Sequence, residues 1–182
     1  MSHGDALRGE FVTLKHYKVA RLVEKPMSNE TLEQRITRLE DLEAIKQLKA
    51  RYCEVCDDDH NHEQVPALFT DDAVWQGEGI GKATGHAEIV ELFRSFQAAI
   101  SFSQHMVQNP IIEITGDTAT GRWYFFGTFT YYKGDVRRWQ AARYHEDYEK
   151  HAGVWMIKHL RVKPPVFSAR YETGWHNGKS AS

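Results

Sequence analysis

The chain has 182 residues, and 23 Lys and Arg stand against 25 Asp and Glu, so its formal net charge is −2. This length fits one domain with an appended segment, and a hydrophobic content of 41% is that of an ordinary globular protein. Together these values exclude collagen-like, wholly disordered and disulfide-framework proteins, and the balanced charge argues against a nucleic-acid binder. Aromatic residues make up 12% of the chain, which indicates a fold that needs large flat apolar surfaces.

Signals of processing or membrane insertion are missing from the N-terminal part of the sequence. Residues 1–27 have no clean period and no long apolar stretch, so we interpret them as an N-terminal extension. No run approaches the roughly 18 apolar residues of a membrane helix. The two cysteines, Cys53 and Cys56, lie inside a helical pattern, which favours small buried apolar residues over a zinc or redox site. We therefore expect a cytoplasmic protein with no membrane association.

Helical periodicity dominates the first half of the remaining chain. Apolar residues from Leu32 to Cys56 follow steps of three and four, which predicts one long amphipathic helix, or two with a bend near Glu40. Charged residues between them, Lys49 included, are assigned to its solvated face. His62–Phe69 and His86–Phe96 are predicted as a second and a third helix.

After the helical segments, apolar and polar residues alternate one by one, which is typical of β-strands. A strand begins at Ala73-Val74-Trp75, and Pro110 marks an edge or a bulge in the second strand. The later predicted strands are Gln104–Thr115, Thr118–Tyr132, Val136–Lys150 and Val154–Val162. Helices followed by an antiparallel meander predict an α+β fold. We expect a cone-shaped α+β barrel over residues 28–167, in which a strongly curved antiparallel or mixed sheet wraps three or four N-terminal helices, with 168–182 as a tail.

The inner face of such a cone is a common place for a small-molecule site. Along the Thr118–Tyr132 strand, every second residue is apolar or glycine, and this set includes Trp123 and Phe125. We assign this face of the strand to the concave side of the sheet. On the last strand, the alternate residues that should face the same side include His159 and Arg161. The alternative is that Arg161 reaches the rim and His159 lies on the surface. His60 and His62 are two residues apart and cannot share a helix face, so no metal site is predicted.

Several segments of the chain resemble the opening and core of SnoaL-like proteins, within the nuclear transport factor 2-like superfamily. The segments that carry the likeness are Ile45–Tyr52, Ala67–Trp75, His105-x-x-x-Asn109-Pro110, Ile112–Tyr124, Tyr144–Lys150 and Gly153–Trp155. The likeness spans roughly Leu39–Val166 and is strongest to lyases such as scytalone dehydratase, bile acid 7α-dehydratase and hexachlorocyclohexane dehydrochlorinase. The chain differs from the bile acid enzyme at Gly127, where that enzyme has an Asp in its pocket. The resemblance implies that, without this carboxylate, the pocket is deeper and more apolar.

The resemblance implies an Asp–His pair inside the cone. His105 takes the place of the histidine, and either Asp57 or Asp58 that of the aspartate, because the loop has one extra residue; we prefer Asp58, although it could instead cap a helix end. Tyr52 and Arg161 correspond to further catalytic positions. Substrate contacts are assigned to Trp75, Phe102, Trp123, Phe125 and His159.

Histidine exchanges protons near neutral pH, and a carboxylate on its second nitrogen fixes its tautomer. The resemblance therefore implies a lyase that needs no cofactor or metal, of the dehydratase, dehydrohalogenase or retro-aldol (deformylating) type. Its expected substrate is an aromatic, phenolic or polycyclic apolar small molecule, as in aromatic compound catabolism. The alternatives are an isomerase or cyclase that uses the same base, and a non-catalytic ligand-binding or dioxygenase β-subunit-like protein. A homotrimer or homodimer is implied, without nucleic-acid partners.

Overall fold

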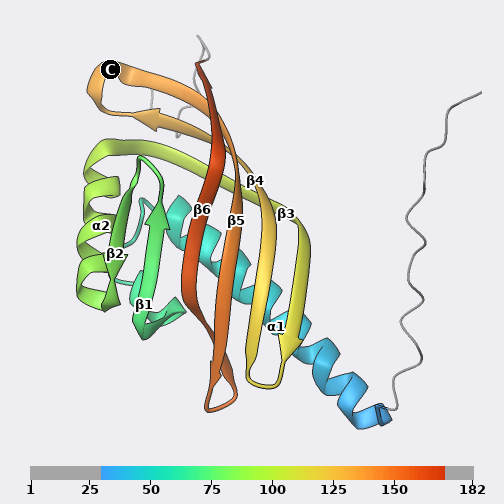
Figure 1. The fold of residues 1–182 in the computed structure, drawn as a ribbon. Helices are drawn as coiled ribbons and strands as arrows, with labels where there is room; N and C mark the ends of the chain where they lie inside the picture. The colour runs from blue at the N-terminus through green and yellow to red at the C-terminus, as the bar shows by residue number, and fades with distance from the viewer. Residues whose placement is uncertain (1–29, 171–182) are drawn as a thin grey trace, which may run out of the picture.

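The computed structural model describes residues 30–170, which form two α-helices and a six-stranded sheet (Figure 1). The expected N-terminal extension 1–27 lies outside the described residues, as does the expected tail from residue 171 onward. The elements are α1 (Leu32–Asp57), β1 (Phe69–Gly77), β2 (Gly81–Thr84), α2 (Gly85–Ala99), β3 (Ile100–Thr115), β4 (Thr118–Tyr131), β5 (Val136–His151) and β6 (Val154–Arg170). Short 3-10 helices lie at Val65–Leu68 and Lys133–Asp135.

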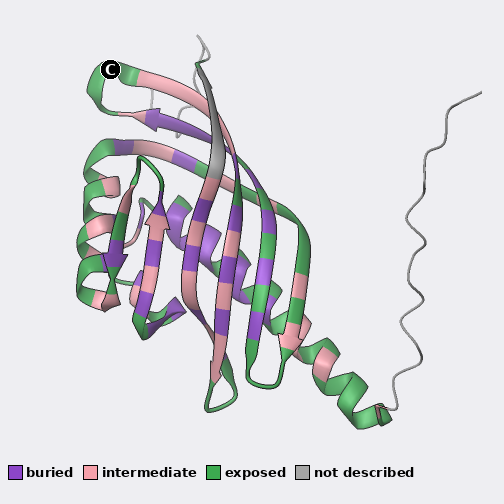
Figure 2. Ribbon diagram, viewed as in Figure 1, coloured by how far each residue is buried: buried purple, intermediate pink, exposed green. Residues whose placement is uncertain are grey.

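Helix α1 is one uninterrupted helix, so the alternative of two helices with a bend near Glu40 is wrong. It begins with a capping box, in which the Gln34 backbone N–H donates to Thr31 Oγ1 at 3.2 Å and the Thr31 N–H donates to Gln34 Oε1 at 2.8 Å. Its C-terminal half packs on the sheet, whereas its first turns are exposed (Figure 2), and Leu32 is 70% exposed. All buried side chains of α1 therefore come from its C-terminal half, from Ile45 to Cys56.

The number of helices is smaller than expected. Within residues 30–170 there are two α-helices, not three or four, because the predicted helix His62–Phe69 is a single 3-10 turn. The side chain of Asn61 accepts the N–H groups of Glu63 and Gln64 at 3.2 Å each, which fixes a turn in place of a helical start. Pro66 then removes one backbone donor, and β1 begins at Phe69.

The sheet has the strand order β2-β1-β6-β5-β4-β3, and only the β1–β6 pair is parallel. It is therefore a mixed, curved α+β sheet, with α1 lying across one face and α2 beside β1 and β2 (Figure 1). The predicted β4 alternation is confirmed: Trp123, Phe125 and Phe129 are buried, and their neighbours in the middle of the strand are exposed. Strand β6 continues beyond its predicted end at Val162 and reaches Arg170, so residues 168–170, which were expected to begin the tail, belong to the sheet.

One extra residue in β6 reverses the predicted orientation of its second half. Ile157 pairs with Tyr148 and His159 pairs with Asp147, so Lys158 forms a β-bulge. A slip of one residue turns the following side chains to the opposite face. Leu160 is therefore buried, and His159 and Arg161 lie on the outer face of the sheet.

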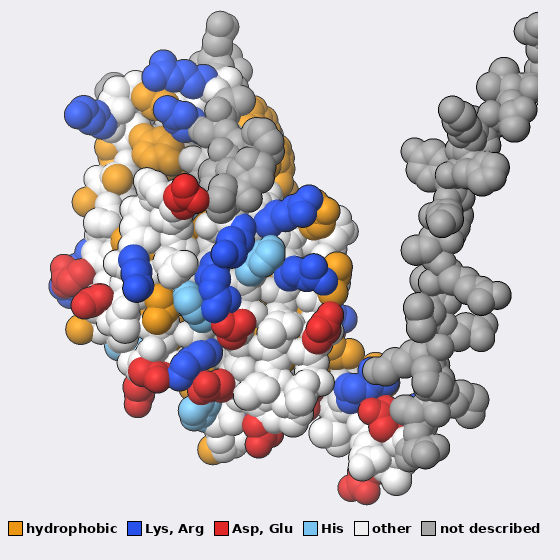
Figure 3. Space-filling model, viewed as in Figure 1, with side chains coloured by type: hydrophobic (Ala, Val, Ile, Leu, Met, Phe, Trp, Pro, Cys, Tyr) orange, Lys and Arg blue, Asp and Glu red, His pale blue; other side chains and the backbone are white. Residues whose placement is uncertain are grey.

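The expected places of Arg161 and His159 in the cavity are thus wrong. Arg161 Nη2 donates to Asp147 Oδ2 at 2.5 Å and to His159 Nδ1 at 2.7 Å, away from the concave face. Figure 3 shows Lys, Arg and His side chains gathered over this outer face of β5 and β6. These two side chains form a surface network rather than part of a pocket.

A buried ion pair joins α1 to β5. Lys49, which was assigned to the solvated face, is fully buried, and its Nζ lies 2.5 Å from Glu146 Oε1. Tyr148 donates its hydroxyl to the other oxygen of Glu146, and Trp123 Nε1 donates to the Tyr148 oxygen at 3.0 Å. The Lys49 ammonium also lies 3.7 Å from the ring centroid of Tyr144. Long-range pairing therefore overrides the local charge pattern at this position.

Candidate active site

A cavity of about 590 Å³ opens between the two helices and the concave face of the sheet. This volume is in the range of small-molecule sites, about 300–1,000 Å³. Its wall is mostly aromatic and aliphatic and includes Tyr52, Cys56, His60, Trp75, Phe93, Phe96, Ile100, His105, Phe125, Phe129, Tyr131, Ala142, Tyr144 and Val162. Lys133, Arg138 and Gln140 add polar groups from the β4–β5 connection and the start of β5. The site thus combines a large apolar volume with a few polar groups.

Asp57 and His105 form a closely held acid–imidazole pair at this wall. Asp57 is the last residue of α1, and its Oδ1 lies 2.7 Å from His105 Nδ1. The backbone N–H of His105 donates to both carboxylate oxygens, at 3.0 and 2.9 Å, and Ser103 Oγ lies 3.4 Å from Oδ1. An ionised carboxylate can only accept, so Nδ1 carries the hydrogen and the lone pair of Nε2 is left free to act as a base.

Aromatic rings hold the His105 imidazole in place. Its centroid lies 5.3 Å from that of Phe125 and 5.2 Å from that of Phe129. Gly127 lies between these residues in β4 and pairs with His105, and a Cβ there would come within 2.6 Å of the Gln104 carbonyl oxygen and 2.7 Å of Phe125 Cζ. The expectation that Gly127 deepens the pocket is therefore wrong, because neighbouring atoms already fill that space.

The preference for Asp58 as the partner of His105 is wrong. Its backbone N–H donates to the Glu54 carbonyl oxygen at 2.8 Å, so Asp58 ends α1, and its Oδ2 accepts from Asn61 Nδ2 at 2.7 Å. Successive helical residues are turned by about 100°, and only Asp57 has the rotation that faces β3. Asp58 therefore belongs to the exposed loop after the helix.

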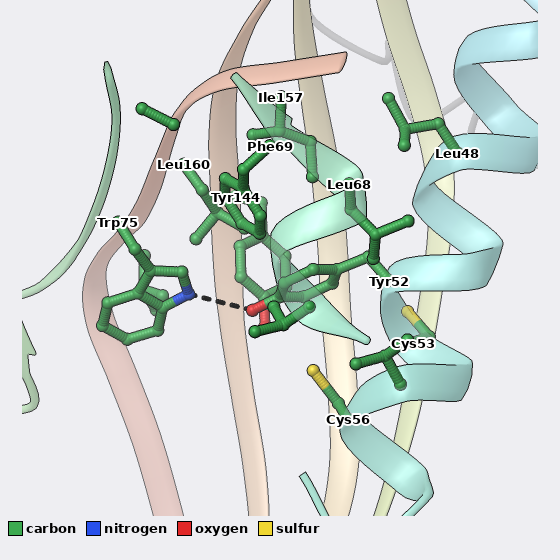
Figure 4. Close-up of a cluster of buried hydrophobic side chains, with 14 of the residues drawn as sticks. Leu48, Tyr52, Cys53, Cys56, Leu68, Phe69, Trp75, Tyr144, Ile157 and Leu160 are labelled. Atoms are coloured by element: carbon green, nitrogen blue, oxygen red, sulfur yellow. Dashed lines mark hydrogen bonds between the residues drawn. The ribbon is translucent and has the colours of Figure 1, made fainter. Parts of the chain in front are cut away.

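Tyr52 and Trp75 come together at the wall, as Figure 4 shows. Trp75 Nε1 donates to the Tyr52 hydroxyl oxygen at 2.9 Å. Burial raises the pKa of Tyr52 well above its usual value, so this hydroxyl keeps its proton near neutral pH. Because its oxygen accepts from Trp75, the Tyr52 O–H acts as a donor, and the Cys56 sulfur already lies within its hydrogen-bonding reach.

Two further predicted contacts lie outside the wall. Phe102 alternates with Ser103 and His105 along β3 and is half-buried on the other side of the strand. The sequence was enough to predict this, because side chains alternate along a strand and Phe102 therefore points to the opposite face from His105. Trp123 is buried in the core, where its indole N–H is taken up by Tyr148. The assignment of Phe102 and Trp123 to substrate contacts is therefore wrong, whereas Phe125 and Trp75 line the cavity.

The two cysteines are buried free thiols, as the helical pattern predicts. Burial raises the pKa of Cys53 to about 11, and it raises that of Cys56 further. Neither thiol is therefore a nucleophile near neutral pH. Cys56 serves instead as part of the cavity wall, and its carbonyl oxygen accepts from Ser103 Oγ at 3.0 Å.

His60 is a cavity residue that the sequence interpretation missed, since it weighed this side chain only as a metal ligand. Its ring is buried beside Phe93 and Phe96 of α2. Burial, with a smaller effect of nearby His105, lowers the pKa of His60 to about 4. Over residues 30–170, no three His, Cys, Asp or Glu side chains gather as a metal ion would require, and no helix there is long and apolar enough to cross a membrane.

Comparison with solved structures shows the same fold in several proteins. A hexachlorocyclohexane dehydrochlorinase of type 2 superposes with a TM-score of 0.72 at 22% identity, over 81% of this chain and 99% of that chain. A candidate scytalone dehydratase from Novosphingobium aromaticivorans gives 0.68 at 19%, over 80% and 99%. A candidate aromatic ring hydroxylase from the same organism gives 0.66 at 27%, over 72% and 94%.

The sequence comparison agrees with the fold. The family profile described as the SnoaL-like domain matches residues 37–161, which contain α1 from its second turn, the whole of β1–β5 and the first half of β6. Asp57 and the residues of the cavity wall up to Tyr144, His105 among them, all fall inside this match. The chain is therefore a member of the SnoaL-like family, within the nuclear transport factor 2-like superfamily.

Proposed function

We propose that this protein is a cofactor-independent lyase that acts on a flat, largely apolar cyclic molecule by Asp–His general-base catalysis. The observation that carries the proposal is the 2.7 Å contact between Asp57 Oδ1 and His105 Nδ1 at the wall of an aromatic cavity. The folds of the dehydrochlorinase and of the candidate dehydratase are compatible with such a reaction.

In the proposed reaction, His105 Nε2 removes a proton from a substrate carbon. The electron pair of that C–H bond forms a double bond to the neighbouring carbon, and the leaving group departs with its own bonding pair. Asp57 stabilises the imidazolium that forms, and the Tyr52 hydroxyl donates to the leaving group or to a developing oxyanion. A base of this kind contributes roughly 10²–10⁴-fold in rate.

An isomerase that uses the same base is the second candidate. Arg161 points away from the cavity, so the one cation expected to assist a leaving group is not near His105. In an isomerase, His105 would return the proton to a different carbon of the same molecule, and no leaving group would be needed. Products distinguish the two reactions: a lyase releases water or a halide, whereas an isomerase conserves the mass of the substrate.

The test is a screen of phenolic alcohols, cyclic β-hydroxy ketones and chlorinated cyclohexanes in deuterated buffer, followed by mass spectrometry. On any substrate found, His105→Gln and Asp57→Asn should each lower kcat by about 10²–10⁴-fold, since the first removes the base and the second removes the carboxylate that orients it and stabilises its imidazolium. Asp58→Asn is the matched control and should stay within about twofold, because its carboxylate contacts Asn61 instead.

Full turnover by His105→Gln would contradict the proposed mechanism. A wild-type protein that neither eliminates nor exchanges deuterium with any compound of the panel would favour the non-catalytic ligand-binding alternative.

A further inference from the structure

His60 lies three residues beyond Asp57, in a tightly held loop that connects α1 to the rest of the fold. Asp59 and His60 both have left-handed backbone, with φ of 54° and 50°. The His60 N–H donates to the Cys56 carbonyl oxygen at 3.1 Å, and Asp59 Oδ2 accepts from Gln97 Nε2 of α2 at 3.1 Å. The loop is therefore tied to both helices, and the direction of the His60 ring is fixed.

The residue His60 is only 4% exposed, yet it borders the cavity. Its centroid lies 5.6 Å from that of Phe96 and 6.0 Å from that of His105. Across residues 30–170, no side chain or backbone group forms a hydrogen bond with either of its ring nitrogens. Neither nitrogen is among the fully enclosed polar atoms of residues 30–170 that lack a partner, so both are open to the cavity and can bond with a molecule inside it.

His60 is a neutral imidazole under ordinary conditions, because its lowered pKa of about 4 keeps it unprotonated near pH 7. A neutral imidazole has one N–H donor and one nitrogen acceptor. Such a ring can donate to a carbonyl oxygen and polarise it without carrying a charge. A hydrocarbon or halocarbon surface could satisfy neither nitrogen.

We propose that His60 determines substrate specificity by hydrogen bonding to a hydroxyl or carbonyl oxygen of the substrate, beside the carbon at which His105 acts. The 6.0 Å between the two ring centroids suits groups on neighbouring substrate atoms. The part played by His105 rests on the proposed function. A site built around such a hydrogen bond rejects analogues that lack the oxygen, because its own polar group is then left unpaired.

Three flat probes of similar shape test this preference: 2-acetylnaphthalene, 2-ethylnaphthalene and 2-chloronaphthalene. Dissociation constants are measured by equilibrium dialysis with the full-length protein. The wild-type protein should bind the acetyl probe at least about tenfold more tightly than the other two. His60→Leu should reduce this ratio to below about threefold by weakening the acetyl probe, whereas His60→Gln, of similar size but with donor and acceptor groups, should retain most of it.

An equal preference in the wild-type protein and His60→Leu would overturn the proposal, as would a wild-type protein that binds the three probes equally or binds none of them. If His60→Leu does not fold, nitrogen NMR of the wild-type imidazoles takes its place. The acetyl probe should then shift the ring nitrogens of His60 and the ethyl probe should not, and identical responses would overturn the proposal. These experiments measure binding alone, so they can be interpreted even if the His105 variants keep full turnover.

Discussion

At the scale of single residues, His60 links the shape of the cavity to the stability of the fold. Its pKa is about 4 in the folded protein, below the ordinary histidine value of about 6.5 that applies to the unfolded chain. Between these two values the unfolded chain binds the proton and the folded protein does not. The contribution of His60 to stability is therefore fully present above about pH 6.5 and is lost as the pH falls toward 4.

This difference predicts a specific pH dependence. From pH 7.5 to pH 5, the free energy of unfolding of the wild-type protein should fall by about 2 kcal/mol more than that of His60→Gln. Urea unfolding of the two proteins at both pH values measures it, and the variant subtracts the titration of all other groups. Equal losses in the two proteins would show that His60 is protonated as easily in the folded state as in the unfolded chain.

The residues of the candidate site were predictable to different degrees. His105 and Tyr52 were expected at the site because of the family resemblance, and Phe125 because of the alternation along its strand; these residues and Trp75 all line the cavity. It could not decide between Asp57 and Asp58, because the choice depends on where α1 stops turning, and one residue changes the direction of the side chain by about 100°. His60 was missed because a tertiary neighbour, α2, creates its aromatic surroundings.

At the scale of elements, the bulge at Lys158 separates two roles within β6. Before it, Trp155 and Ile157 enter the core, and after it Leu160 takes over that role while Arg161 points outward. The long strands and their turns were predictable from alternation and from Gly-Asp pairs. The bulge was not, because Lys158 carries none of the glycine or proline signals that usually mark such a site.

The outward direction of Arg161 has a measurable result. Arg161→Gln should leave the dissociation constants of the naphthalene probes within about twofold, and should lower the free energy of unfolding by roughly 0.2–1 kcal/mol, as expected for an exposed ion pair. Equilibrium dialysis and urea unfolding give the two quantities. A tenfold loss of probe binding would instead place Arg161 in the cavity, as the strand parity first indicated.

At the scale of the whole molecule, the Lys49–Glu146 pair fixes the main helix against the sheet beneath the cavity. Lys49→Met would leave the Glu146 carboxylate buried without its cation, and breaking a buried pair costs about 3–5 kcal/mol. The double variant Lys49→Met/Glu146→Met removes both charges and keeps apolar volume, so it should regain at least about half of that loss. Urea unfolding of wild-type, single and double variants provides the comparison, and a double variant less stable than the single one would contradict it.

The same ion pair has a consequence for how this chain can diverge. Because either charge alone is costly in the core while both or neither can be accommodated, a substitution at position 49 creates a selective advantage for a matching substitution at position 146. Among descendants of this sequence, we expect the two positions to covary, with the pair exchanged for two apolar residues more often than either member is lost alone. Such correlated replacement would link a helix and a strand that are 97 residues apart along the chain.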